Sequence, residues 1–107
     1  MSEPTLSTMI VEYIRYEAED GEKLVAAYQV AGESLKASSH CHGFELTRCT
    51  EAPNTFILRI LWDSAEGHMQ GFRTSPEFKS FFAAIAPFVK QIREMRHYEH
   101  TTVRWSR

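Results

Sequence analysis

The sequence predicts an α+β protein in which two helices cover one face of a four-stranded antiparallel sheet, the split βαβ arrangement. The main observation is that the hydrophobic period switches along the chain in the order strand, helix, strand, strand, helix, strand. The second is size, because 107 residues with 43% hydrophobic composition suit one compact domain. We therefore expect a single domain over residues 1–107, with its core between about 9 and 103.

The first strand and the first helix follow each other directly. Residues 8–17, TMIVEYIRYE, alternate β-branched and aromatic residues with charged ones, which is typical of a strand. Residues 18–39 then place Leu24, Tyr28 and Leu35 at helical spacing, with charged residues mostly opposite them. This pattern predicts an amphipathic helix, for which the aspartate at position 20 is a candidate N-cap.

The next two strands are predicted to form a hairpin. Residues 41–50, CHGFELTRCT, and residues 55–63, TFILRILWD, are separated by EAPN, which supplies turn residues. The second of these strands is apolar on both faces. It is therefore expected in the centre of the sheet, covered on each side.

The last part of the chain predicts two helical segments and a fourth strand. Asp and Ser at 63–64 are typical of the start of a short helix, and Ser75 followed by Pro76 predicts a second start. The apolar stripe of this second helix runs from 78 to 89 despite an internal proline. Residues 92–105 are expected to form the fourth, polar-rich strand.

One face of this sheet remains uncovered by the predicted helices. Neighbouring side chains of a strand alternate, so Tyr13 and Ile14 cannot both lie under the helices, nor can Ile57 and Leu58. A second subunit packing sheet to sheet is the simplest cover. We therefore expect a homodimer.

Charge and composition restrict the partners. Twelve basic and fourteen acidic residues give a formal charge of -2, without a basic block, which argues against nucleic-acid and anionic-membrane partners. No signal-like leader or run of eighteen apolar residues occurs, so we expect a cytoplasmic protein. If Cys41 and Cys49 share a strand, they lie ~26 Å apart at about 3.3 Å per residue, which excludes a disulfide between them.

The stretch SHCHG at 39–43 has two interpretations. His40 and His42 share a face of a regular strand and could supply two ligands to zinc or copper. Candidate further ligands are Cys49, His97 and His100. The alternative is a simple entry into the strand, and we favour it and expect no metal, because no CxxC or HExxH spacing accompanies the histidines.

Several residues between 62 and 82 could carry chemistry. Trp62 ends a strand, where its ring can fill the core or stack on a substrate, and His68 is either a general acid or base beside a pocket or a half-exposed helix histidine. Gly67 and Gly71 share a helix face, where they either let another backbone or a flat ligand approach or weaken the helix so that it moves. Arg73 can hold an anionic oxygen or sit in solvent. The phenylalanines at 78, 81, 82 and 88 are core first and pocket lining second.

HCHGFEL at 40–46 and FILRILWDSAEGHMQGFRTSPEFKSFF at 56–82 resemble the antibiotic biosynthesis monooxygenase family. The shared features are a second strand with a glycine before an aromatic residue, a third strand ending in Trp, Asp and Ser, and a helix that starts at Ser-Pro-x-Phe-Lys. The resemblance implies a ferredoxin-like protomer, a homodimeric α+β barrel and a cavity between sheet and helices. It also implies oxidation of quinols or phenolic polyketides without metal or flavin, or, in some relatives, haem binding and degradation.

Two departures from the family patterns restrict what the resemblance implies. Quinol-monooxygenase-like members carry a histidine four positions before the helix-starting proline, where this chain has Phe72. Haem-degrading members combine a first-strand asparagine, a tryptophan and a histidine; Trp62 matches, but Phe82 occupies the histidine position and the first strand lacks asparagine. Of the haem-related functions, only haem binding through His68 remains open.

The leading hypothesis is therefore a cofactor-independent monooxygenase acting on a quinol or polycyclic phenol. The expected catalytic residues are Trp62, His68 and Arg73. The expected substrate-binding residues are Tyr13, Arg15, Phe72, Phe78 and Phe82. The alternatives are a non-catalytic ligand-binding dimer and a haem-binding protein of the same fold.

Overall fold

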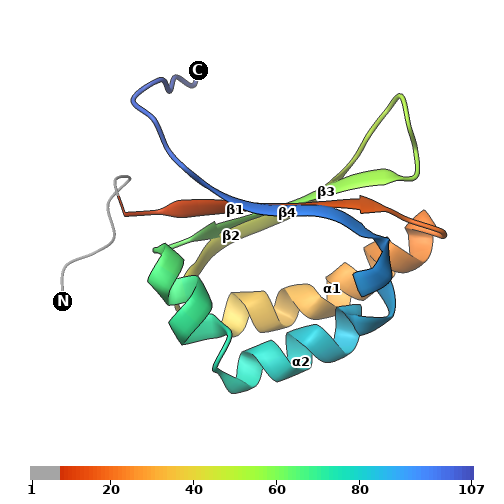
Figure 1. Ribbon diagram of the computed structural model, residues 1–107, viewed down its shortest axis with the longest axis horizontal. Coiled ribbons are helices and arrows are strands. Elements are labelled where there is room, and N and C mark those ends of the chain that lie inside the picture. Colours follow the sequence, from red (N-terminus) through yellow and green to blue (C-terminus); the bar gives the residue numbers. More distant parts are fainter. Residues whose placement is uncertain (1–7) are drawn as a thin grey trace.

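The computed structural model describes residues 8–107, so residues 1–7 of the expected domain lie outside the described part of the chain. A four-stranded sheet forms one layer and two helices form the other (Figure 1). The sheet order is β2-β3-β1-β4, and every neighbouring pair is antiparallel. The elements are β1 (Ile10–Glu17), α1 (Gly21–Ala37), β2 (Cys41–Arg48), β3 (Thr55–Trp62), α2 (Pro76–Ile85) and β4 (Ile92–Glu99). The predicted ferredoxin-like split βαβ fold is confirmed.

Local side-chain caps set where the helices begin. The Asp20 side chain accepts hydrogen bonds from two backbone N–H groups of the first turn of α1, as predicted. The Ser75 hydroxyl accepts from the Phe78 N–H at the start of α2, with Pro76 at the first helical position. The Ser64 hydroxyl accepts from the Gly67 N–H over 2.8 Å and so opens the short helical segment before α2.

Two further helical segments differ from the predicted helices. The segment η1 (Gly67–Phe72) is a π-helix, a form that is frequent at functional sites. The apolar stripe from 78 to 89 is not one helix, because α2 ends at Ile85 and η2 (Ala86–Gln91) continues it as a 3₁₀ helix. Pro87 has no N–H to bond the preceding turn, which explains the change. The predicted strands also end earlier, at Arg48 and at Glu99.

The hydrophobic core lies between the layers and is filled by alternate residues of the two central strands. On β1 the inward residues include Ile14 and Tyr16, and on β3 they are Phe56, Leu58, Ile60 and Trp62. Leu24 and Leu35 of α1 pack onto them and are fully buried. Burial of one such side chain stabilises the fold by about 1.5–3 kcal/mol.

The stretch SHCHG is the entry into β2, which begins at Cys41. A bulge between Cys41 and Gly43 makes His42 an extra residue in the pairing with β3, so His40 and His42 do not form the regular strand face that a metal pair requires. His40 Nδ1 instead lies 2.8 Å from Asp63 Oδ2. Both cysteines are free thiols.

The face of the sheet that points away from the helices carries partly exposed apolar and aromatic residues. Tyr13 and Tyr98 contact each other edge to face there and are 37% and 45% exposed. The segment after β4 rises from the sheet on the side away from the helices (Figure 1). None of the described helices is long and apolar enough to cross a membrane.

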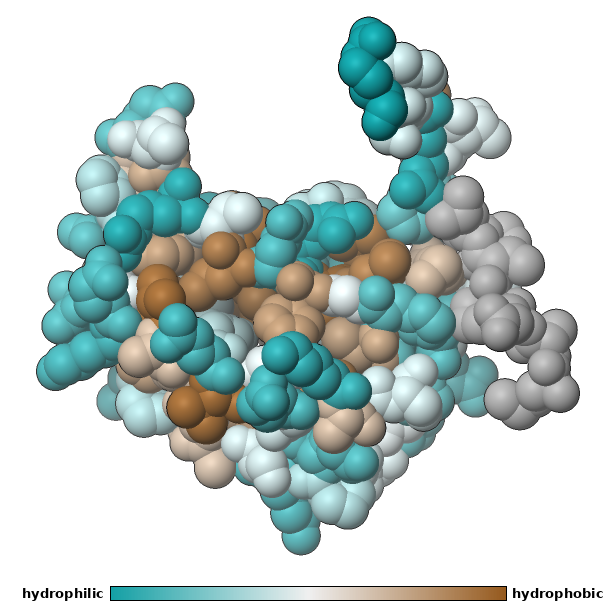
Figure 2. Space-filling view, turned by 180° about the vertical axis from the view of Figure 1, so that it is seen from behind, coloured by the Kyte–Doolittle hydropathy of each residue, from teal (hydrophilic) through white to brown (hydrophobic). Residues whose placement is uncertain are grey.

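A second apolar region opens along the edge of the two layers. Seen from behind, brown apolar surface gathers in a band between the sheet and the helices (Figure 2). A hollow of about 340 Å³ between α1 and β2 is lined by Val25, Phe44 and Leu46, among others. It lies on the other side of Tyr28 from the pocket described below, which Tyr28 also lines.

Candidate active site

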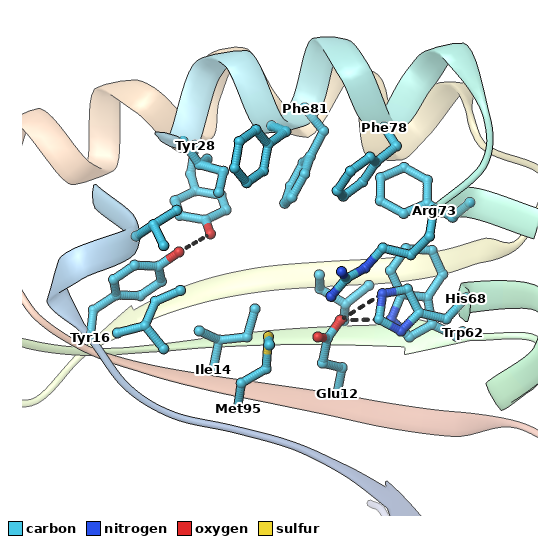
Figure 3. A pocket seen from close by; sticks show the side chains of 16 residues that line it. Glu12, Ile14, Tyr16, Tyr28, Trp62, His68, Arg73, Phe78, Phe81 and Met95 are labelled. Atoms are coloured by element: carbon cyan, nitrogen blue, oxygen red, sulfur yellow. Dashed lines mark hydrogen bonds and ion pairs between the residues drawn. The ribbon is translucent and has the colours of Figure 1, made fainter. Parts of the chain in front are cut away.

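A pocket lies between the sheet and α2, with a cavity of about 150 Å³ (Figure 3). Its middle is apolar, and polar side chains gather at two places along it. Three of the apolar residues, Phe78, Phe81 and Phe82, come from α2, and Ile14 and Met95 come from the sheet. The other lining residues are Glu12, Tyr16, Tyr28, Ile60, Trp62, His68, Phe72, Arg73, Ile85, Val89 and Ile92.

Trp62 and His68 form the floor of one end. Trp62 is the last residue of β3 and is fully buried. The His68 ring stacks on its indole with centroids 4.3 Å apart and planes 8° from parallel. Phe72 packs against the same indole at 4.9 Å. These contacts fix the orientation of the His68 ring.

Glu12 is the buried acid of the site, and the sequence analysis did not single it out. It is 2% exposed and shares the inward face of β1 with Ile14 and Tyr16. Its Oε1 accepts a hydrogen bond of 3.0 Å from Trp62 Nε1 and lies 3.6 Å from His68 Nε2. The sequence does contain a signal for Glu12: it lies two residues before Ile14 and therefore on the same face of the strand. A charged residue is unusual on a strand face that is buried.

His97 connects the site to the surface and was also missed as a site residue. It lies directly opposite Glu12 in the pairing of β1 with β4. Its Nε2 lies 2.7 Å from His68 Nδ1, and its own side chain is exposed. A hydrogen-bonded route therefore leads from the pocket through the imidazole of His68 to solvent.

Burial controls the protonation of both groups at this end. Burial raises the pKa of Glu12. The hydrogen bond from Trp62 and the electrostatic effects of His97 and Arg73 act in the opposite direction but are smaller, so the pKa stays above its usual value. The pKa of His68 is lowered to about 3, first by burial and then by electrostatic interactions with His97 and Arg73. The imidazole of His68 is therefore uncharged near neutral pH, with one nitrogen as donor and the other as acceptor.

Arg73 follows η1 and brings a cation to the rim of the same end. Its guanidinium lies 5.3 Å from the centroid of the Phe78 ring. It forms no ion pair with any residue in the described part of the chain. Its charge is thus available to an anionic group in the pocket.

Gly67 and Gly71 serve packing within the protein. A Cβ built on Gly71 would lie 2.3 Å from His40 Nε2, and one on Gly67 would lie 1.8 Å from Asp63 Oδ1. The group that approaches these glycines is the hydrogen-bonded side-chain pair of His40 and Asp63, where the sequence analysis expected a backbone or a ligand. These glycines let η1 lie against the entry to β2.

Six of the eight predicted site residues line this pocket, namely Trp62, His68, Phe72, Arg73, Phe78 and Phe82. Tyr13 and Arg15 do not. They lie on the opposite face of β1, because Glu12, Ile14 and Tyr16 take the inward positions of the alternation. Tyr13 packs on Tyr98 there, and Arg15 pairs with Glu17 over 3.3 Å.

The metal and haem options can be tested on this geometry. Among the described residues, Glu12, His68 and His97 have possible ligand atoms within 4.8 Å of one another. His68 Nδ1 already contacts His97 Nε2 at 2.7 Å, however, and His68 Nε2 lies 3.6 Å from Glu12 Oε1, so the imidazole is held between two protein groups. The cavity of about 150 Å³ is also small for haem, because pockets for drug-sized ligands measure about 300–1,000 Å³. The residues therefore do not fit haem.

The fold and pocket define a class, a ferredoxin-like α+β protein with an aromatic cavity between sheet and helices that holds a buried acid and histidine. The family is shown by sequence: the family model for antibiotic biosynthesis monooxygenases matches residues 8–84. The chain belongs to this family.

Individual proteins share the fold at low identity. A Bordetella bronchiseptica structure assigned to the antibiotic biosynthesis monooxygenases superposes with a TM-score of 0.75 at 24% identity, over 88% of this chain and 98% of that one. A variant of SnoaB, a cofactor-independent oxygenase from Streptomyces nogalater, gives 0.71 at 9% identity, over 92% and 96%. Bacillus subtilis YczJ is 28% identical over 54 residues, half of this chain and 57% of YczJ.

Proposed function

We propose that this protein is a monooxygenase that oxidises a quinol or related phenol with molecular oxygen and needs neither metal nor flavin. The observation that carries the proposal is the group of Glu12 and His68, both buried, with the exposed His97 behind them, at the end of an aromatic pocket. A phenolic ring suits the apolar walls, and proton transfer is available where its hydroxyl would lie. Family membership and the fold shared with SnoaB support the same reaction class.

The reaction makes three demands on the protein. A deprotonated hydroquinone passes one electron to oxygen, the two radicals combine at a ring carbon to give a peroxide, and loss of water leaves an oxygenated quinone. Each turnover consumes one oxygen molecule and releases one water. The protein must supply a dry cavity, a proton acceptor and a stabiliser of negative charge.

His68 is the proposed proton acceptor. When its Nδ1–H donates to His97, its Nε2 is left with a lone pair on the side of Glu12 and the pocket. A proton taken from the substrate at Nε2 is matched by one released from Nδ1 to His97, which is exposed. The positive charge that this relay leaves on His97 lies close to the carboxylate of Glu12, which stabilises it when that group is ionised.

The remaining pocket residues position the substrate. Arg73 is the proposed stabiliser of the phenolate and of the peroxide oxygen, because its guanidinium has no carboxylate partner among the described residues. Trp62 holds the His68 ring in place by stacking. Phe72, Phe78 and Phe82 form apolar wall. Tyr13 and Arg15 have no part in this pocket.

The proposal includes a homodimer that covers the outward face of the sheet. Tyr13, Ile57, Leu61 and Tyr98 are partly exposed on that face. Trp105, in the segment that rises on the same side, is 77% exposed. A second sheet would bury these groups, and light scattering of the purified protein measures the resulting mass. The free thiols suit the reducing cytoplasm, where we place the dimer.

Oxygen uptake tests the proposed reaction. Chelator-treated protein is incubated with anthrones, naphthoquinols and benzoquinols, and uptake is corrected for the autoxidation of each compound. Saturable uptake with one oxygen consumed per quinone formed is expected. Uptake no faster than autoxidation across the panel, with saturable binding of the same compounds, would show the non-catalytic ligand-binding dimer instead.

A further inference from the structure

The second polar place in the pocket consists of two tyrosine hydroxyls. Tyr16 of β1 and Tyr28 of α1 are 0% and 4% exposed, and their hydroxyl oxygens lie 2.5 Å apart. Both residues line the pocket. In Figure 3 the two hydroxyls lie at the end opposite Glu12, His68 and Arg73, with Ile14 and Met95 between the two ends.

This hydroxyl pair has one donor more than it uses. Two hydroxyls carry two O–H protons, and the bond between them satisfies one. Neither hydroxyl has another hydrogen-bond partner among the described residues. Burial raises the pKa of both tyrosines, so both keep their protons at neutral pH. A buried O–H therefore remains without an acceptor at the wall of the pocket, a state that costs free energy unless a ligand accepts.

The spacing and size of the pocket fit one aromatic ring between its two polar ends. Glu12 and Tyr16 are four residues apart on β1, hence ~13 Å between Cα atoms at about 3.3 Å per residue. The two polar groups therefore lie at opposite ends of the cavity, and a ring with oxygens at opposite positions offers one oxygen to each end. The cavity has a volume of about 150 Å³. An engineered protein cavity of about 150 Å³ binds benzene, so this cavity has room for a single aromatic ring.

We propose that Tyr16 and Tyr28 form a second oxygen-binding subsite, so that the pocket selects a single-ring aromatic ligand with oxygen substituents in para positions. One oxygen lies at Glu12 and His68, and the other accepts the spare O–H of the tyrosine pair. Oxidation of such a ligand rests on the proposed function, whereas its binding to the two polar ends does not. The subsite narrows the proposed substrate from quinols and related phenols to benzene-1,4-diols and their ethers.

A matched pair of ligands tests the subsite without any turnover. 4-Methoxyphenol and 4-ethylphenol have nearly the same shape and differ in one para oxygen. Anaerobic calorimetric titration should show about tenfold tighter binding of 4-methoxyphenol, as expected for one hydrogen bond to an otherwise unpaired buried donor. A polycyclic phenol such as 1-hydroxyanthracene should bind more weakly than either.

The double variant Tyr16→Phe/Tyr28→Phe removes both hydroxyls together. Replacement of both partners by apolar groups of the same shape leaves no orphaned donor, so the variant is expected to fold. Its preference for 4-methoxyphenol should disappear, whereas each single variant keeps one O–H and keeps a preference. Tyr98→Phe on the outward face is the matched control and should bind like the wild type.

The possible outcomes separate the subsite from the reaction. Equal binding of the two phenols by the wild type, an unchanged preference in the double variant, or tighter binding of the polycyclic phenol would each overturn the subsite proposal. The expected preference together with no uptake of oxygen on 1,4-hydroquinone would support the subsite and refute the oxygenase. Uptake on 1,4-hydroquinone that is equal in wild type and double variant would support the oxygenase and overturn the subsite.

Discussion

Replacement of His68 by phenylalanine separates chemistry from packing at the site. His68→Ala would remove the ring that stacks on Trp62 at 4.3 Å and leave a void in the core. His68→Phe keeps a ring of similar size and removes the two nitrogens that face Glu12 and His97. A change of activity in this variant therefore reports on the nitrogens.

The structure gives the expected size of both effects. The fold loses one hydrogen bond, from His68 to His97, which contributes about 1 kcal/mol. For a domain of this size that corresponds to a fall in Tm of about 4–8 °C. Loss of a general acid or base lowers kcat/KM by about 10²–10⁴-fold. The loss of activity should thus greatly exceed what the small loss of stability explains.

Oxygen uptake and thermal unfolding of the same preparation provide the measurement. His97→Phe serves as the matched control, because it removes the same hydrogen bond from the exposed side and leaves the imidazole in the pocket. It should show the same fall in Tm but retain more activity. If His68→Phe folds and turns over quinol within a few-fold of the wild type, the proposed role of His68 is wrong.

Stability against pH provides a second readout of the same residue. Because burial lowers the pKa of folded His68 to about 3 from an ordinary 6.5, the unfolded chain binds more protons there between these values. The free energy of unfolding that His68 contributes is therefore fully present above pH 6.5 and is lost as the pH falls toward 3. Between pH 3 and 6.5 the free energy of unfolding should therefore change less with pH in His68→Phe than in the wild type, which urea unfolding at several pH values measures. The same pH dependence in both proteins would show that His68 is not held neutral by burial.

Three further variants probe the surroundings of His68. Glu12→Gln keeps an acceptor for the Trp62 indole but cannot ionise. In the wild type kcat/KM should rise with pH as Glu12 ionises at its raised pKa, and in Glu12→Gln this rise should be absent. A pH profile like that of the wild type would contradict a role for the Glu12 carboxylate. Arg73→Gln should raise KM or lower kcat about tenfold while Tm stays within a few degrees, and unchanged kinetics would show that the guanidinium does not reach the substrate. Gly71→Ala should lower Tm, because the added Cβ clashes with the His40 ring. In the His40→Ala background the same change should raise the free energy of unfolding by about 0.4–1 kcal/mol, because Gly71 does not have a positive φ. Additive effects of the two substitutions in this double-mutant cycle would contradict the contact between Gly71 and His40.

Local signals in the sequence predicted the elements of the fold well. Asp20 and Ser75 cap the helices where the sequence places them, since a cap needs only neighbours one turn away. The apolar periodicity likewise identified the strands, because a period of two or of 3.6 is a property of one segment. Where the prediction was wrong, at the ends of β2 and β4 and beyond Ile85, tertiary pairing or Pro87 ended the element.

The part of the site that lies on consecutive segments was also predictable. Trp62, His68 and Arg73 fall between the end of β3 and the start of α2, so one stretch of chain brings them to one end of the pocket. Tyr13 and Arg15 lie outside this pocket for a definite reason. Both faces of β1 carry large apolar residues, and alternation alone does not say which face meets the helices.

The sequence by itself therefore determined most of the strands and helices, the caps and the part of the candidate site that lies between Trp62 and Phe82. Only the tertiary structure decided the rest, because Glu12, Tyr16 and His97 reach the candidate site through the pairing of β1 with its neighbours. Tyr28 meets Tyr16 only when α1 packs on the sheet. Burial, which shifts the pKa values of Glu12 and His68, is a property of this assembly of distant segments and of no single segment.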